Sequence, residues 1–239
     1  MITRIARIAG RVLVLLALLY ALLVGLGLLL TKVIEHSWLI REEDGVNRAL
    51  EDGRTPTMND VTYLLSGLGN TQAIIGAMVV VAIVLRLASR RWSMSVFLIL
   101  AVSAQALVFL LVTLTIDRQR PHVRHLDSSP PTSSFPSGHT GAATALFIAS
   151  ALLVLWFVRK RWVKILGITV LVAVPLLVAY GRLYRGMHHP TDVVGSYING
   201  LACIAIAATG VFGRWGRDTE HDSDPSLSAT PAETPAGTG

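Results

Sequence analysis

The sequence predicts an all-α membrane protein, a bundle of six transmembrane helices with both termini in the cytoplasm. Composition is the first observation behind this expectation, since 52% of the 239 residues are hydrophobic and only 15% are charged. Ordinary globular proteins carry about 25% charged residues, so part of this chain must have lipid as its solvent. The second observation is the mean hydropathy of +0.57, which also indicates a chain that lies partly in lipid. The third observation is that the apolar residues gather in uninterrupted runs, most of them near the about 20 residues that cross a bilayer.

Six apolar runs define the expected helices in order. They cover residues 12–30, 72–87, 93–116, 140–158, 163–180 and 193–212. The first follows several arginines as a signal peptide would, but no small-residue cleavage site closes it, so a membrane anchor is expected. The second is the shortest, and we expect it to begin within 64–70 or to be tilted. Residues 1–214 then form one membrane domain, and the polar segment 215–239 is expected to be a disordered cytoplasmic tail.

Positive charges orient the bundle, because Lys and Arg accumulate on the cytoplasmic side of a membrane. They cluster before the first run, between the second and third, between the fourth and fifth, and after the sixth. The loop 32–71 instead holds more acidic than basic residues. This pattern predicts a multi-pass protein of the plasma or inner membrane. It also accounts for the net charge of +6 without a nucleic-acid partner.

The loop 32–71 contains a weakly amphipathic stretch around Leu39 and Val46. This stretch could lie on the membrane surface, and a plain connecting loop is an equal alternative.

Three polar segments interrupt the apolar pattern. They read Asp-Arg-Gln-Arg-Pro at 117–121, Phe-Pro-Ser-Gly-His-Thr at 135–140, and Gly-Arg-Leu-Tyr-Arg-Gly-Met-His-His-Pro-Thr-Asp at 181–192. The first follows the third expected helix, the second precedes the fourth, and the third joins the fifth to the sixth. All three are therefore predicted at the extracytoplasmic face, where they can converge on one site.

These segments supply the groups that phosphoryl transfer requires, namely cations and backbone donors that hold phosphate oxygens in line with a nucleophile. Arg120 and Arg182 offer guanidinium groups that bind two oxygens at once. Ser137 and Gly138 precede the fourth helix, where free backbone N–H groups and the helix dipole favour an anion. We therefore expect these four residues to bind the substrate phosphate.

Two histidines and a carboxylate are the expected catalytic residues. His188 and Asp192 are four residues apart, which places them on one face of a helical turn. Asp192 could accept a hydrogen bond from one ring nitrogen of His188 and leave the other nitrogen to attack phosphorus. His139 is placed to protonate the leaving oxygen and then to activate water. No cofactor is expected, and a dinuclear metal site is disfavoured because only Asp117 and Asp192 accompany the histidines.

The three segments resemble the signature motifs of the type 2 phosphatidic acid phosphatase (PAP2) superfamily, in its integral-membrane lipid phosphatase branch. The family pattern is Lys, six residues, Arg-Pro; then Pro-Ser-Gly-His; then Ser-Arg, five residues, His, three residues, Asp. The matches are at 120–121, 136–139 and 182–192. The resemblance implies a six-helix fold and a phosphohistidine intermediate, with His188 as nucleophile, His139 as acid, and Arg120 and Arg182 as phosphate ligands.

Two positions depart from that pattern, since Thr113 stands where the family has lysine and Gly181 stands where it has serine. The first change removes one cation from the expected phosphate site. Arg118, on the same segment, could replace that cation as a phosphate ligand. Arg124 and Arg185 are interpreted as interfacial anchors.

The expected activity is metal-independent hydrolysis of a membrane lipid phosphate or diphosphate. A polyprenyl (undecaprenyl or decaprenyl) diphosphate is the first expected substrate, and phosphatidate or phosphatidylglycerophosphate is the alternative. Phosphotransfer to another lipid or sugar would use the same residues, and a non-enzymatic binding or transport protein is a third class. The expected partners are the lipid substrate and the bilayer, and no oligomeric state follows from the sequence.

Overall fold

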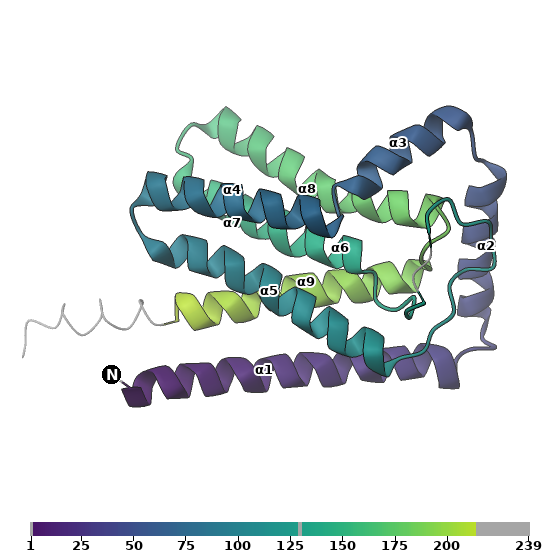
Figure 1. Ribbon diagram of the computed structural model, residues 1–239, viewed down its shortest axis with the longest axis horizontal. Coiled ribbons are helices and arrows are strands. Elements are labelled where there is room, and N and C mark those ends of the chain that lie inside the picture. Colours follow the sequence, from purple (N-terminus) through teal and green to yellow (C-terminus); the bar gives the residue numbers. More distant parts are fainter. Residues whose placement is uncertain (1, 129–130, 214–239) are drawn as a thin grey trace, which may run out of the picture.

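The computed structural model describes residues 2–128 and 131–213 (Figure 1). Within this part of the chain six helices are long and apolar enough to cross a membrane. They are α1 (Ile2–Leu28), extended by the π-helical turn η1 (Leu29–Val33); α4 (Thr71–Ser89); α5 (Trp92–Thr115); a helix made of α6 (Gly138–Ala143), the π-helical turn η2 (Thr144–Ile148) and α7 (Ala149–Phe157); α8 (Arg161–Tyr184); and α9 (Pro190–Val211). The predicted all-α six-helix bundle is confirmed. The expected tail 215–239 lies outside the described residues.

The transmembrane helices enclose two apolar cores. One core lies between α4, α5, α7, α8 and α9 and includes Phe97 and Leu146. The other lies between α1, α5 and α9 and includes Leu23 and Val112. Helix α5 packs against α4, α9 and α1, so it belongs to both cores. Burial of apolar side chains on two sides of α5 therefore fixes the helix that forms one wall of the site.

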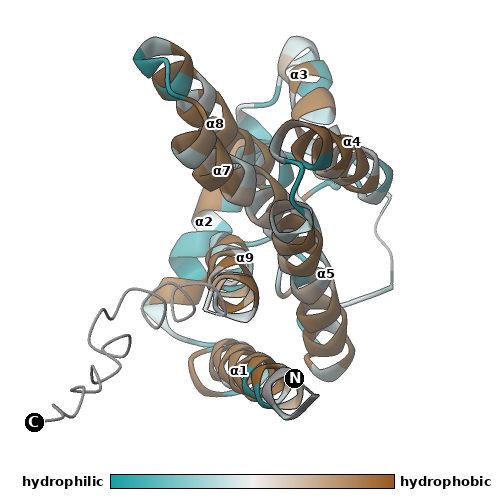
Figure 2. Ribbon diagram, turned by 90° about the vertical axis from the view of Figure 1, so that its left-hand side faces the viewer, coloured by the Kyte–Doolittle hydropathy of each residue, from teal (hydrophilic) through white to brown (hydrophobic). Residues whose placement is uncertain are grey.

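The outer faces of the bundle are also apolar. Large exposed side chains include Leu13, Leu87, Leu114 and Trp156, and Figure 2 shows hydrophobic colouring over most of α1, α4, α5 and α7. An apolar surface of this extent is unfavourable in water and fits the hydrocarbon of a bilayer.

The two ends of the bundle differ. The start of α1 and the end of α9 lie at one end, and the other end carries α2, the loop segments 116–128 and 131–137, and the turn between α8 and α9 (Figure 1). All three polar segments are thus brought to the same end, as the order of the helices predicted.

The loop 32–71 folds into two helices, α2 (Trp38–Asp52) and α3 (Pro56–Gly67). Helix α3 begins with the Thr55 side chain accepting from the Met58 N–H, and with Pro56 at its first position. Helix α2 turns Glu43 and Asn47 inward, so it covers the end of the bundle with a polar face. Residues 64–67 complete α3, and the second span begins at Thr71, so of the two alternatives the earlier start within 64–70 is wrong.

The third polar segment is more helical than predicted. Helix α8 continues to Tyr184, so Arg182 lies in its last turn and not in a loop. Helix α9 begins at Pro190, three residues before the sixth apolar run, with His189 as its N-cap. The Asp192 carboxylate accepts a hydrogen bond from the His189 backbone N–H at 2.8 Å, and this contact caps the start of the helix.

Candidate active site

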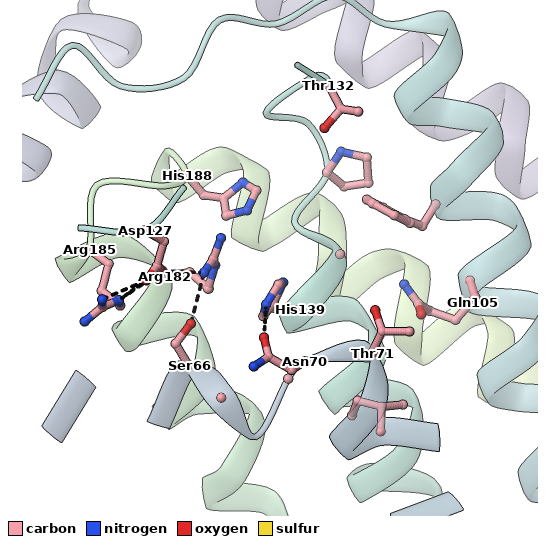
Figure 3. A pocket seen from close by; sticks show the side chains of 18 of the residues that line it. Ser66, Asn70, Thr71, Gln105, Asp127, Thr132, His139, Arg182, Arg185 and His188 are labelled. Atoms are coloured by element: carbon pink, nitrogen blue, oxygen red, sulfur yellow. Dashed lines mark hydrogen bonds and ion pairs between the residues drawn. The ribbon is translucent and has the colours of Figure 1, made fainter. Parts of the chain in front are cut away.

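A cavity of about 800 Å³ opens at the end of the bundle that carries the polar segments. Its walls come from the turn between α3 and α4, from α5, from the loop 116–137, from the first turn of α6, and from the turn between α8 and α9 (Figure 3). Of the predicted site residues, five line it: Arg120, Gly138, His139, Arg182 and His188. The fold therefore gathers residues from all three motifs around one cavity.

His188 is buried with one of its ring nitrogens already engaged. Its Nδ1 lies 2.8 Å from the carbonyl oxygen of Ser134. Because a carbonyl oxygen only accepts, Nδ1 carries the hydrogen, and the lone pair of the neutral ring is on Nε2. Burial lowers the pKa of His188 to about 4, against the opposing attraction of Asp192. The ring is thus neutral at physiological pH and can act as a nucleophile through Nε2.

Asp192 supports His188 in a way that differs from the prediction. Its Oδ2 is 3.7 Å from His188 Nδ1, too far for a hydrogen bond. The carboxylate is fully buried and accepts instead from the Ser134 hydroxyl, the His189 N–H and Arg118. Asp192 therefore holds both segments that position His188, and the direct partner of the ring is the Ser134 carbonyl.

Arg118 does not occupy the place expected of a phosphate ligand. Its guanidinium lies behind the histidine, where Nη1 donates to Asp192 and to Thr191 Oγ1 (2.7 Å) and Nη2 donates to Glu43 of α2. The side chain is buried between these two carboxylates and does not line the cavity. The expectation that Arg118 replaces the family lysine as a phosphate ligand is corrected, because its guanidinium is already paired with the carboxylates of Asp192 and Glu43.

Two further positions also lie outside the cavity lining. Thr113, where the family has lysine, is buried on α5, and its hydroxyl has no partner among the described residues. Ser137 is fully buried and acts as the N-cap of α6, accepting from the Thr140 N–H. Its hydroxyl therefore shapes the helix start, and Gly138 is the residue of this pair that faces the cavity.

His139 occupies the first turn of α6, as predicted, and meets a residue from outside the motifs. Its Nε2 lies 2.7 Å from Oδ1 of Asn70, which precedes α4 (Figure 3). Within the described residues its Nδ1 has no hydrogen-bond partner. The two histidines are therefore held through opposite ring nitrogens.

Of the two predicted phosphate arginines, Arg182 is buried and Arg120 is half-buried, and both have unpaired donors within the described residues. Arg120 Nη1 donates to the Met187 carbonyl at 2.7 Å, and Arg182 Nη1 donates to Ser66 Oγ at 3.0 Å. The Nε atoms of both arginines are buried without a partner in the described part of the chain. Buried polar groups are nearly always hydrogen-bonded, so these two donors indicate the place of an anionic ligand.

Arg185 is buried at 5% exposure and lines the cavity, so its interpretation as an interfacial anchor is wrong. Its Nε and Nη2 contact both oxygens of Asp127 at 2.7–2.9 Å, and Arg182 Nη1 contacts the same carboxylate at 2.9 Å. Burial alone would raise the pKa of Asp127, but the bond from Arg185 and the charge of Arg182 outweigh it and lower that pKa. Arg124, in contrast, is exposed as predicted.

No cluster of three or more His, Cys, Asp or Glu side chains in the described ranges has the spacing of a metal site. The polar residues that sequence reasoning missed all lie outside the motifs: Glu43, Ser66, Asn70, Asp127 and Ser134. The acidic excess of loop 32–71 was the one sequence signal that bears on them, and it did not single out Glu43.

The fold and the cavity define an integral-membrane protein with histidines and arginines gathered around one cavity. The PAP2 superfamily matches residues 92–215, over half of the chain, and the chain belongs to this family. The family is therefore the one that the spacing of the motifs predicted.

Two curated relatives are phosphatases. The undecaprenyl-diphosphatase of Sulfolobus acidocaldarius is 37% identical over 90 residues, which cover 36% of this chain and only 39% of the relative. The phosphatidylglycerophosphatase B of Bacillus subtilis is 25% identical over 177 residues, which cover 73% of this chain and 85% of the relative.

Two solved structures share the fold. The transmembrane PAP2-type phosphatidylglycerolphosphate phosphatase from Bacillus subtilis has a TM-score of 0.69 at 20% identity and covers 86% of this chain and 98% of its own. Aquifex aeolicus LpxE has a TM-score of 0.53 at 23% identity and covers 69% of this chain and 93% of its own.

Proposed function

We propose that this protein hydrolyses a membrane lipid phosphate or diphosphate through a phosphohistidine on His188. One observation carries the proposal: Nε2 of His188, left free by the Ser134 contact, shares a cavity with two arginines whose buried Nε donors have no partner among the described residues. An anion bound by Arg120 and Arg182 would satisfy these donors. It would also bring phosphorus next to a neutral nucleophile.

The reaction divides into two steps. In the first, the Nε2 lone pair attacks phosphorus, the bond to the lipid oxygen breaks, and His139 gives a proton to that oxygen. In the second, water attacks phosphorus and gives its proton to His139, and the N–P electron pair returns to Nε2. Arg120 and Arg182 neutralise the oxygens in both steps, as electrostatic catalysis of phosphoryl transfer requires.

The cavity also has an apolar wall. Ile74 and Ile75 of α4, and Phe109 and Leu110 of α5, line it on the side of these helices. A hydrocarbon chain can lie along this wall while its phosphate reaches the arginines, which supports a lipid as the substrate. The charge pattern of the loops supports an extracytoplasmic position for this end of the bundle.

A polyprenyl diphosphate is the first candidate substrate, in keeping with the archaeal relative named above. Phosphatidylglycerophosphate is the second, and one further observation favours it. Gln105 of α5 lines the cavity, is 1% exposed, and has no side-chain hydrogen bond within the described residues. An unpaired buried amide matches the ester or hydroxyl groups of a glycerolipid, which a polyprenyl chain lacks.

A phosphate-release assay in detergent tests both the proposed mechanism and the proposed substrate. Wild type, His188→Asn and Gln105→Leu would be compared on polyprenyl diphosphate, phosphatidate and phosphatidylglycerophosphate, with EDTA present throughout. We expect His188→Asn to lose all turnover, by at least about 10⁴-fold. Residual activity above a few per cent, or a requirement for an added divalent ion, would overturn the mechanism.

The Gln105→Leu arm separates the substrates. If the second candidate is right, this variant should lose about 2- to 10-fold in kcat/KM on glycerolipids only, because one hydrogen bond contributes about 0.5–1.5 kcal/mol. An unchanged profile on all three lipids would remove the support that Gln105 gives to a glycerolipid, and the relative kcat/KM of the wild type would then rank the substrates. Release of inorganic phosphate, and not of a phosphorylated acceptor, distinguishes hydrolysis from phosphotransfer.

A further inference from the structure

We name residues 65–70, where α3 ends and the chain turns into α4, the α3–α4 corner. This corner packs directly against His139. A Cβ added to Gly69 would lie 2.9 Å from both the Cβ and the carbonyl oxygen of His139. Only glycine permits this approach, because real Cβ atoms do not come so close to backbone. The corner is thus packed on the first turn of α6 at the residue proposed as the acid.

The backbone of the corner holds Asn70 in place. The N–H groups of Leu68, Gly69 and Asn70 each donate to the carbonyl three residues earlier, at 3.0–3.3 Å, and the Asn70 carbonyl accepts from Ile74 to begin α4. This tight turn leaves little freedom at Asn70, so the 2.7 Å contact from its Oδ1 to His139 Nε2 is built into the fold.

The chemistry of this contact selects a nitrogen. An amide oxygen only accepts, so His139 Nε2 carries a hydrogen that stays with Asn70. Nδ1, which has no partner within the described residues, is then the nitrogen that can hold and release the second proton. The corner also supplies Ser66 Oγ to Arg182, so one element contacts both the acid and a phosphate arginine.

We infer that Asn70 is a positioning residue for the general acid: it fixes His139 through Nε2, so that Nδ1 exchanges the proton with the leaving oxygen in the first step and with water in the second. This inference rests on the proposed function. It adds a residue from outside the three motifs, and outside residues 92–215 that the family matches.

The test uses the leaving group, because general acid catalysis matters most where the leaving oxygen is most basic. The first-turnover release of the leaving group would be measured for dodecyl phosphate, whose alkoxide needs a proton, and for p-nitrophenyl phosphate, whose phenolate leaves without one. We expect Asn70→Ala to slow the first substrate by about 10²-fold and the second by less than about 3-fold. His139→Gln should show the same selectivity more strongly.

Two further variants complete the experiment. Asn70→Asp keeps an acceptor and adds a negative charge that favours the protonated ring, so it should retain activity and move the basic limb of the pH–rate profile to higher pH. Leu68→Ala changes an exposed side chain of the same corner that does not line the cavity, and should match wild type.

Equal slowing of both substrates by Asn70→Ala, no slowing of either, or a change in KM alone would overturn the inference about Asn70. The proposed function fails separately, since it requires His188→Asn to be inactive on both substrates.

Discussion

The hydrogen-bond partners of the two histidines of the site contact opposite ring nitrogens. The Ser134 carbonyl takes the Nδ1 hydrogen of His188, and the Asn70 amide takes the Nε2 hydrogen of His139. Each partner only accepts, so each leaves the opposite ring nitrogen for chemistry. In the proposed reaction, the same side chain type therefore serves as nucleophile at one position and as acid and base at the other.

The pH dependence of turnover should reflect the burial of His188. Because its pKa is lowered to about 4, the ring is neutral above that value and becomes protonated, and inactive, as the pH falls through it. We expect the acid limb of the kcat/KM profile at about pH 4, and not at the pKa of a free histidine, which is about 6.5. Phosphate monoesters titrate near about pH 6, so two substrates whose phosphate pKa values differ should be compared. An acid limb near 6.5 with both would contradict the assignment.

Sequence spacing predicted that these residues share one site but did not reveal their hydrogen-bond partners. His188, His139, Arg120 and Arg182 all line one cavity, as the motifs predicted. The partners that choose the nitrogen are not local: Ser134 lies 54 residues from His188, and Asn70 lies 69 residues from His139. Only packing of distant segments brings them together, so no periodicity or spacing reveals them.

At the scale of elements, α2 closes the back of the site. Its buried Glu43 pairs with Arg118 and accepts from Thr191 Oγ1 at 2.6 Å, next to Asp192. One buried cation thus lies between two buried carboxylates, from α2 and α9. Removal of one partner from such a group leaves an uncompensated charge, which typically costs about 3–5 kcal/mol.

Arg118→Met should therefore destabilise the protein by about 3–5 kcal/mol and lower kcat more than it raises KM, because the residue supports Asp192 and does not touch substrate. Adding Glu43→Gln should recover part of the stability. Arg124→Met, at an exposed arginine of the same loop, is the control. These effects can be followed by thermal unfolding and steady-state kinetics. If Thr113→Lys instead restores the activity of Arg118→Met, Arg118 is a phosphate ligand after all, and its assignment as a support for Asp192 is contradicted.

The elements themselves were predictable to different degrees. Apolar runs of membrane length predicted all six spans, because lipid leaves few alternatives to a helix. For α2 the sequence does not decide between an amphipathic stretch and a loop, because the inward side of this helix is polar and its position depends on the Glu43–Arg118 pair, 75 residues apart. The last turn of α8 was missed because Arg182 and Arg185 interrupt the apolar run while the backbone stays helical to Tyr184.

At the scale of the whole molecule, the chain keeps its site at one end of the bundle and the start of α1 and end of α9 at the other (Figure 1). Loop charges favour the site end outside the cytoplasm. The chain has a single cysteine, Cys203, which is buried, so labelling sites can be added in a Cys203→Ala background.

A membrane-impermeant maleimide applied to intact cells should label Ser128→Cys, at the site end, and spare Lys160→Cys, at the other end. Both positions are exposed, so accessibility differs only through the membrane. Labelling of both variants after permeabilisation is the control. The reverse pattern in intact cells would place the active site in the cytoplasm.

The phosphohistidine itself is the central claim, and trapping it is the most direct measurement. His139→Gln should still accept phosphate from radiolabelled p-nitrophenyl phosphate, because that leaving group needs no acid, and should then hydrolyse the intermediate slowly. We predict nearly one acid-labile, alkali-stable phosphate per chain, located in the peptide that contains His188 and absent when His188→Asn is added. Acid-stable label, label on another residue, or label that persists without His188 would contradict the account.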